Sequence, residues 1–353
     1  MANSIQNGQP WLDTKGDRIQ AHAGALYYEN DTFYWYGENK EYTKGKGKIW
    51  TWGIRCYSSK DLYNWEDLGL IIEPDLKNKK SPLHPHRRID RPHILFCAAT
   101  GKYVCWLKEN GSNAKFHILT ADALLGPYTL VRQDVQLMGM VAGDFDMTVD
   151  PETGKGYILF CQEWEGVLCM TLTEDYLDVT GEKSICYEGL HPPFCREGIT
   201  CFHRNDHHYL LTSGMIGYIP NPSQVATFDS WHGPMTEQGN PHVNDDSCAS
   251  FNSQISQVFK HPHKKDLYIA LADRWVPDFV MTRERYDWIS TTIASHYDKK
   301  YKASLFDFLK LLKTPMMGSA NTSLSQYIWL PIRFEGDRLL IDWKEEWQIE
   351  DYE

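Results

Sequence analysis

The sequence has 353 residues and a net charge of −11, and no Lys/Arg cluster in it is long enough to follow a phosphate backbone. Nucleic acid is therefore excluded as a partner. Tryptophan, tyrosine and phenylalanine make up 13% of the residues, which favours β-structure and supplies flat rings for stacking on sugars. No apolar run reaches the roughly 18–20 residues that span a bilayer, so no membrane partner is expected.

The cysteines and the N-terminal residues indicate in which cellular compartment the protein is expected. The nine cysteines form no C-x-x-C pair, and several lie in strand-like stretches, which indicates free buried thiols and no structural zinc. Residues 1–6 lack the basic start and apolar core of a signal peptide. We expect a cytoplasmic protein, although an exported chain trimmed of its leader would show the same pattern.

Five short hydrophobic stretches, each containing a tyrosine near its start, recur along the chain and predict buried strands. Their tyrosines are 52 to 69 residues apart, and turn-forming residues precede most of them. Repetition at this period is typical of four-stranded sheets arranged around an axis, so we predict an all-β, five-bladed β-propeller spanning 1–353 as a single domain. The stretches are Phe33–Glu38, Lys102–Leu107, Gly156–Phe160, His208–Ser213 and Leu267–Leu271.

A helical insertion near 282–320 interrupts the repeat. Leu305, Phe308, Leu309 and Leu312 follow the helix period, and Ser304 is a suitable N-cap. We expect a surface helix packed on the fifth blade, with a pocket lid or a dimer contact as the alternative. Residues 327–332 and 339–343 then predict two closing strands.

Four polar clusters precede the second to fifth tyrosine strands by similar distances. Equivalent offsets in a repeat place residues at equivalent positions on each blade, so we expect these clusters to converge on one axial pocket. Short basic stretches at 44–48 and 77–80 are instead interpreted as solvated loops. The clusters are 88–92, 143–148, 196–199 and 250–254.

Two carboxylates in these clusters suit acid catalysis. Asp146 and Glu197 in one pocket would push each other's pKa values apart, because a like charge disfavours ionisation and burial raises the pKa of a carboxylic acid further. An acid that stays protonated near neutral pH is what cleavage of a glycosidic bond needs, since the leaving oxygen must receive a proton.

The ordered set of motifs resembles glycoside hydrolase family 43, and most closely its exo-β-1,3-galactanase-like branch. The resemblance covers nearly the whole chain. Its motifs are 19–24, 34–38, 56–62 with 64–65, 91–92, 146–147, 196–197, 211–214, 273–275 and 329–331.

The resemblance implies catalytic roles. Glu197 matches the general acid and Asp146 the carboxylate that tunes its pKa. The first-blade aspartate that activates water in most of the family is absent, and Gln254 matches the glutamine that holds the water in the galactanase-like branch. Asp90 stands where that branch has a glutamate. A neutral amide cannot accept a proton, so Asp90 is the alternative base.

The resemblance also implies sugar contacts at His22, Glu38, Tyr218, Asp273 and Tyr327. Trp106 and Trp164 lie near pocket segments but are equally consistent with packing. The histidines at 84, 86 and 93 and at 203, 207 and 208 lack a metal-ligand spacing. No catalytic metal and no required cofactor is expected, while a structural calcium on the propeller axis is compatible with the resemblance.

We therefore expect an inverting glycoside hydrolase that releases terminal sugars from oligosaccharides, with exo-β-1,3-galactosidase or galactanase-like activity. The alternatives are an α-L-arabinofuranosidase or β-xylosidase of the same family, and a non-catalytic carbohydrate-binding propeller. A protein-interaction propeller fits less well, because the WD-type repeat signature is absent. The sequence does not give the oligomeric state.

Overall fold

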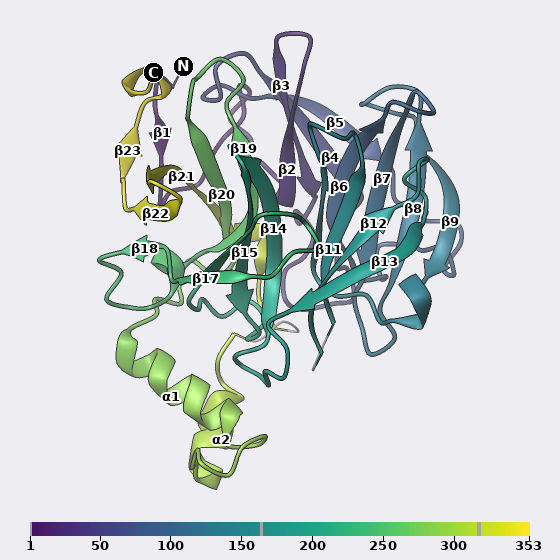
Figure 1. The fold of residues 1–353 in the computed structure, drawn as a ribbon. Coiled ribbons are helices and arrows are strands. Elements are labelled where there is room, and N and C mark those ends of the chain that lie inside the picture. The colour runs from purple at the N-terminus through teal and green to yellow at the C-terminus, as the bar shows by residue number, and fades with distance from the viewer. Residues whose placement is uncertain (1, 163–164, 316–318) are drawn as a thin grey trace.

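The computed structural model describes residues 2–162, 165–315 and 319–353, and its main sheets form a ring of five blades (Figure 1). This confirms the predicted five-bladed propeller. Four blades are four-stranded antiparallel meanders, and the fifth is a five-stranded sheet.

The strands of the five blades follow one another along the chain. Blade 1 contains β2 (His22–Glu29), β3 (Thr32–Glu38), β4 (Ile54–Ser59) and β5 (Glu66–Ile72). Blade 2 contains β6 (Ile89–Cys97), β7 (Lys102–Glu109), β8 (Lys115–Ala121) and β9 (Thr129–Val135). Blade 3 contains β10 (Phe145–Val149), β11 (Gly156–Gln162), β12 (Gly166–Leu172) and β13 (Val179–Cys186). Blade 4 contains β14 (Arg196–Arg204), β15 (His207–Gly214), β16 (Gln224–Phe228) and β17 (Thr236–Gly239). Blade 5 contains β19 (Gln254–Lys260), β20 (Tyr268–Arg274), β21 (Gln326–Glu335), β22 (Arg338–Asp342) and β18 (His242–Val243).

The five tyrosine stretches occupy the same place in every blade. They form the second strands β3, β7, β11, β15 and β20, where nearly every residue is buried between neighbouring blades. Burial on both faces explains why these strands are continuously apolar rather than alternating. The polar clusters fall at the start of the innermost strands, as their common offset predicts.

The two ends of the chain meet at one end of the molecule (Figure 1). Near the N-terminus, β1 (Ile5–Gln6) pairs antiparallel with β23 (Glu346–Trp347) near the C-terminus. The predicted closing strands are β21 and β22, and they complete blade 5. Pairing of the chain ends therefore adds to the packing that holds the last blade beside the first.

The innermost strand of a blade pairs with only one strand of its own sheet, so its other edge is free. At this edge, N–H groups donate to side chains of the preceding blade. Because a buried N–H without an acceptor is costly, each such contact fixes two blades relative to each other. These bonds run from Leu26 N–H to Gln257 Oε1 (2.7 Å), Ile94 N–H to the Tyr36 hydroxyl (2.9 Å), Cys201 N–H to Asp146 Oδ2 (2.8 Å) and Val258 N–H to Thr200 Oγ1 (3.1 Å).

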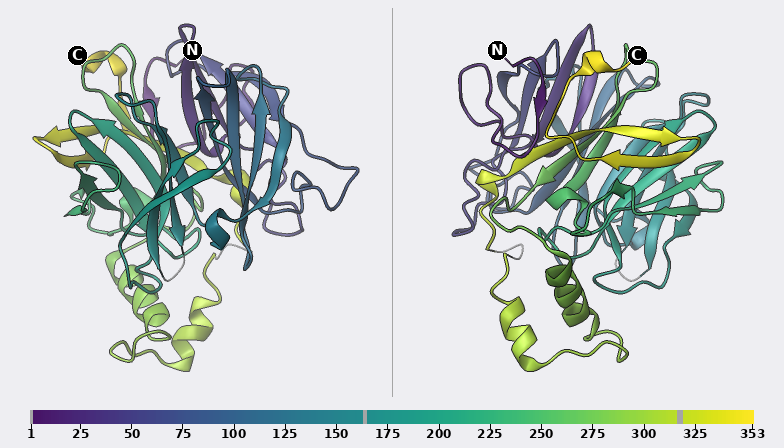
Figure 2. Two further views of the ribbon diagram at one scale, coloured as in Figure 1. Left: turned by 45° about the vertical axis from the view of Figure 1, so that its right-hand side comes forward. Right: turned by 90° about the vertical axis from the view of Figure 1, so that its left-hand side faces the viewer.

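The insertion holds two helices where one was predicted. The predicted helix is α2 (Leu305–Leu311), and Ser304 caps it as expected. The expected packing was wrong: Leu305 is 77% exposed and Leu312 is 76% exposed, while Leu311 is the buried residue. Figure 2 shows the helices projecting from the ring instead of lying on the fifth blade.

The other helix, α1 (Arg283–Ala294), lacks an apolar period in its sequence. Its buried positions are Ile289, Ser290, Thr292 and Ala294, so small and polar residues face the protein. With Leu311, Ile289 packs on Ile216 and Ile219 of the segment that follows β15. The insertion therefore supports a blade 4 loop.

None of the nine cysteines forms a disulfide, as expected, and seven of them are buried. None of the helices in the described ranges is both long and apolar enough to cross a membrane.

The contact between Thr200 and Val258 allows a test of the blade-to-blade bonds. Thr200→Val keeps the shape but leaves the Val258 N–H without an acceptor, so we expect the free energy of unfolding to fall by about 1–3 kcal/mol in urea titrations. Thr236→Val on the exposed edge strand β17 is the matched control. Equal stability of the two variants would contradict this role.

Candidate active site

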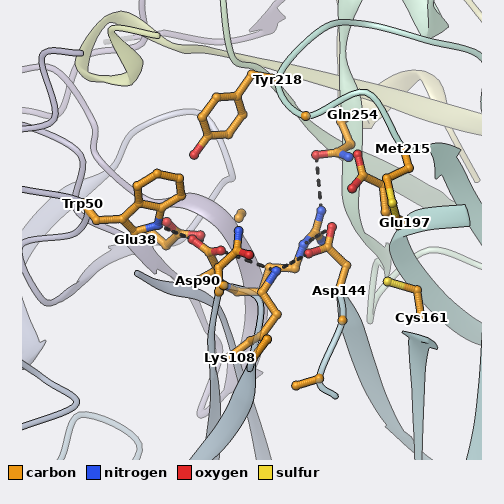
Figure 3. Close-up of a pocket in the computed structure, with 18 of the residues that line it drawn as sticks. Glu38, Trp50, Asp90, Lys108, Asp144, Cys161, Glu197, Met215, Tyr218 and Gln254 are labelled. Carbon is orange, nitrogen blue, oxygen red and sulfur yellow. Dashed lines mark hydrogen bonds and ion pairs between the residues drawn. The ribbon is translucent and has the colours of Figure 1, made fainter. Parts of the chain in front are cut away.

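A pocket of about 230 Å³ lies where the innermost strands begin, and it collects side chains from several blades (Figure 3). Glu197 and Gln254 lie on one side, and Trp50 and Asp90 lie opposite, with Tyr218 above them in this view. Lys108, Asp144 and Trp275 also line the pocket. The predicted convergence of polar clusters is thus observed.

β-Bulges at the start of the innermost strands orient the side chains of the pocket. The register shifts near Ala23, Arg91 and Gly198, and all three have positive φ (44°, 49° and 61°). Such a bulge turns its N–H out of the ladder toward the previous blade. A carboxylate binds each of these N–H groups, and the pairs are Ala23 with Asp273 Oδ2 (2.8 Å), Arg91 with Glu38 Oε1 (3.0 Å) and Gly198 with Asp144 Oδ2 (3.0 Å).

Asp144 is held by two cations as well as by the Gly198 N–H. Arg91 Nε lies 2.9 Å from Oδ2, and Lys108 Nζ lies 2.5 Å from Oδ1. Although burial opposes ionisation, Arg91 and Lys108 hold the pKa of Asp144 well below its usual range. Asp144 is therefore a fixed negative charge in the pocket.

Glu197 has the opposite environment. Burial, reinforced by the charge of Asp144, raises the pKa of Glu197 to about 8, although Lys108 and Arg91 work against the shift. Near neutral pH this carboxyl group is protonated and can donate a proton. Next to it, Arg196 donates to Thr212 Oγ1 (2.9 Å) and to the Thr212 carbonyl (3.1 Å), which fixes the backbone that carries the acid.

Asp146, expected to tune the acid, does not line this pocket. Its Oδ1 lies 3.1 Å from His93 Nδ1, and its Oδ2 accepts the Cys201 N–H. Asp144 and Asp146 point to the same side of the strand, but two residues separate them by about 7 Å along the axis. The charge of Asp144 raises the pKa of Glu197, whereas Asp146 links its own blade to the two neighbouring blades through His93 and Cys201.

Gln254 is held by three neighbours. Its Oε1 accepts from Trp275 Nε1 (3.1 Å) and Arg91 (3.3 Å), and its Nε2 donates to Ser213 Oγ (2.8 Å). One amide N–H is left for a further partner. Gly198 is needed here, since an added Cβ would lie 3.0 Å from Gln254 Nε2 and 2.6 Å from Ser213 Oγ.

Asp90 is also bound on both oxygens. Trp50 Nε1 donates to Oδ1, and Lys108 Nζ lies 3.4 Å from Oδ2. Asp90 is 8% exposed and reaches the pocket despite its short side chain. Lys108 balances the charge of Asp90, and the carboxylate oxygens keep lone pairs that can accept a further hydrogen bond.

The five predicted sugar contacts fall into two groups. Glu38 and Tyr218 line the pocket; burial raises the pKa of Glu38 to about 7, against the effect of Lys40, whose Nζ is 2.5 Å away. The other three do not line it, but form a buried cluster beside it. In that cluster His22 Nδ1 lies 2.8 Å from Asp273, and its Nε2 lies 3.3 Å from the Tyr327 hydroxyl.

Lys108 was missed by the sequence reasoning, although a signal exists. In four blades, the residue four or five positions after the strand tyrosine pairs with the polar residue of the innermost strand. These second-strand residues are Glu38, Lys108, Ser213 and Asp273, opposite His22, Asp90, Glu197 and Gln254. Trp50, which lies in a connection between strands, has no such signal. Trp106 is fully buried and donates to the Tyr176 carbonyl, so it belongs to the core, whereas Trp164 lies outside the described residues.

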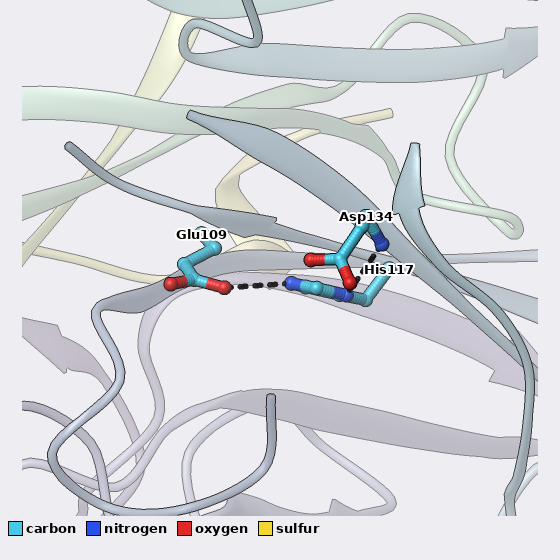
Figure 4. Close-up of side chains that lie close together, drawn as sticks. All are labelled: Glu109, His117 and Asp134. Atoms are coloured by element: carbon cyan, nitrogen blue, oxygen red, sulfur yellow. Dashed lines mark hydrogen bonds and ion pairs between the residues drawn. The ribbon is translucent and has the colours of Figure 1, made fainter. Parts of the chain in front are cut away.

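A group of three possible metal ligands occurs in blade 2, and none of the three lines the pocket (Figure 4). His117 Nε2 lies 2.9 Å from Glu109, which also pairs with Arg87 (2.7 Å), and Asp134 pairs with Lys115. These contacts balance the charges, so we assign no metal here. No second group of this kind occurs in the described ranges.

The sequence comparison identifies the family. Residues 19–288 match the model of glycosyl hydrolases family 43, about three quarters of the chain, so the protein belongs to this family. This confirms the family and the class of enzyme predicted from the motifs. No curated protein matches the sequence significantly.

Solved structures extend the comparison. A family 43 β-1,3-galactosidase is 26% identical, with a TM-score of 0.79 over 99% of this chain and 65% of that one, so this chain spans about two thirds of its length. An exo-β-1,3-galactanase from Clostridium thermocellum is 25% identical, with a TM-score of 0.71 over 97% and 66%. A second β-1,3-galactosidase, solved with galactodeoxynojirimycin, is 23% identical (TM-score 0.77, 98% and 100%) and shows the fold alone.

Replacing Asp144 tests which carboxylate controls the acid. In Asp144→Asn the like charge is lost and two cations remain, so the pKa of Glu197 falls. We expect the alkaline limb of kcat/KM, near pH 8 in the wild type, to move by about one unit or more toward acid. Asp146→Asn is the matched control and should leave the limb in place; a shift in that variant instead would contradict the assignment.

Proposed function

We propose that this protein is an exo-acting, inverting glycoside hydrolase that releases terminal β-1,3-linked galactose from oligosaccharides. The observation that carries the proposal is the contrast between a protonated Glu197 and an ionised Asp144 in one pocket. Groups whose environments push their pKa values apart mark an acid and its electrostatic partner.

In the proposed reaction Glu197 protonates the oxygen that leaves C1 of the terminal sugar. A water attacks C1 from the opposite face, held between Asp90, which lies across the pocket from Glu197, and the remaining amide N–H of Gln254. Because an amide cannot take a proton, the proton of the attacking water passes to bulk solvent after the C–O bond has formed. Such a route requires a dissociated, oxocarbenium-like transition state.

The substrate proposal draws on the similar structures and on the pocket. Both structures at 25–26% identity are described as β-1,3-galactan or β-1,3-galactoside hydrolases. Both cations that line the pocket have carboxylate partners, Arg91 with Asp144 and Lys108 with Asp144 and Asp90, which suits an uncharged sugar. The pocket volume leaves room for one ring and a few waters, in line with exo action.

Glu197→Gln is the direct test of the acid. With β-1,3-galactobiose as substrate we expect kcat to fall by about 10²–10⁴-fold, because proton donation to the leaving oxygen is lost. Product is measured by anion-exchange chromatography, with nitrophenyl arabinofuranoside and xyloside in parallel. Cleavage of either glycoside in preference to galactobiose would overturn the substrate; unchanged activity of the variant would overturn the role of Glu197.

Asp90→Ala separates support from base catalysis. Lys108 and Trp50 already satisfy this carboxylate, and in the proposed reaction it supports the water without taking its proton. We therefore expect kcat to fall by about 10–100-fold and sodium azide not to restore it. Gln254→Ala, assayed in parallel, should lower kcat at least as much. Formation of a galactosyl azide with recovery of kcat in Asp90→Ala would show that Asp90 is the base.

A further inference from the structure

A groove of about 610 Å³ adjoins the pocket and shares a wall with it. Trp50 and Tyr218 line both cavities, and their rings stack at 6.2 Å with an angle of 25°. The pocket and the groove therefore meet at this aromatic wall.

The groove differs from the pocket in its charge. Its lining contains no aspartate or glutamate, and the described residues give its three lysines and its arginine no carboxylate partner in any hydrogen bond or ion pair. This is unusual in a chain with a net charge of −11. The basic residues of the lining are Lys44, Lys46, Lys48, His86 and Arg88.

Arg88 stands at the junction of the two cavities. Its guanidinium lies 5.2 Å from the centre of the Trp50 ring, and the same ring donates its N–H to Asp90 in the pocket. A group bound by Arg88 is thus one aromatic ring away from the sugar that Asp90 faces.

The loop that carries the three lysines is seated against the protein. Thr43 Oγ1 donates to the Trp50 carbonyl (2.8 Å), and the Thr43 carbonyl accepts from Ser323 N–H (3.2 Å). Gly45 has φ 69° and packs so closely that an added Cβ would lie 2.5 Å from the Ser319 carbonyl oxygen. The loop is solvated as expected, since all three lysines are exposed, and it also forms one wall of the groove, with its lysines at alternate positions.

We propose that this groove binds an anionic sugar unit, bearing a carboxylate or a sulfate, that is linked to the leaving-group side of the galactose in the pocket. Lysine and arginine recognise both anions through charge-assisted hydrogen bonds. The inference rests on the proposed function and deepens it: the substrate is an acidic galacto-oligosaccharide, neutral at its terminal unit and charged one or two units further on.

Three substrates test the groove. They are β-1,3-galactobiose carrying a glucuronic acid on O6 of its reducing-side galactose, the same compound with glucose in that place, and galactobiose sulfated at that O6. We expect kcat/KM at low ionic strength to be about tenfold higher for at least one acidic substrate than for the neutral one, as several weak ion pairs add. The preference should disappear in about 0.5 M salt.

The variant Lys44→Gln/Lys46→Gln/Lys48→Gln should reduce this preference to about one while changing kcat/KM for the neutral substrate less than about twofold. Lys77→Gln/Lys79→Gln/Lys80→Gln removes three exposed lysines of similar spacing outside the groove and should keep the preference. A wild-type enzyme that treats all three substrates equally, or a control variant that loses the preference, would overturn the proposal.

Failure of the proposed function is distinguishable from failure of the groove. If none of the substrates is cleaved, the galactosidase proposal fails, and calorimetry on Glu197→Gln then tests the groove alone. Tighter binding of an acidic compound than of the neutral one supports the groove, and equal binding overturns it.

Discussion

The contact between a carboxylate of one blade and a bulge N–H of the next is the interaction on which the site depends. Asp273, Glu38 and Asp144 each bind such an N–H, on Ala23, Arg91 and Gly198. In each case the bulge lies at the start of an innermost strand. Because the acceptor comes from the neighbouring blade, the position of each functional side chain is set by the packing of the ring.

The same contacts explain why two carboxyl groups of one pocket differ in protonation state. Asp144 receives a backbone N–H and two cations, whereas Glu197 is a partly buried residue whose backbone is fixed by Arg196. Burial and the Asp144 charge raise the pKa of Glu197. The helical insertion takes part from outside, since α1 and α2 pack on Ile216, next to the pocket residue Met215.

Much of this architecture could be predicted from the sequence because a repeat shows equivalent positions directly. The strand tyrosines identified the second strand of every blade, and the offset clusters located Asp90, Glu197 and Gln254. Asp144 could not be separated from Asp146, since residues two apart on a strand share a face and differ only in depth. Partners such as His22 and Asp273, 251 residues apart, are joined only by ring closure. The apolar side of α2 was expected to pack on the fifth blade but is exposed. An apolar period predicts a helix with one apolar side, but it does not show whether another segment packs on that side.

The central claim is that Glu197 is protonated at neutral pH, and its pKa can be measured directly. Carbon-13 NMR of protein labelled at the glutamate δ-carboxyl would show one resonance that is absent from Glu197→Gln. A midpoint near pH 8 for that resonance is what the burial of Glu197 beside an ionised Asp144 requires. A midpoint near the ordinary glutamate value of about 4.3 would contradict the account, because the acid would then be ionised where the enzyme must donate a proton.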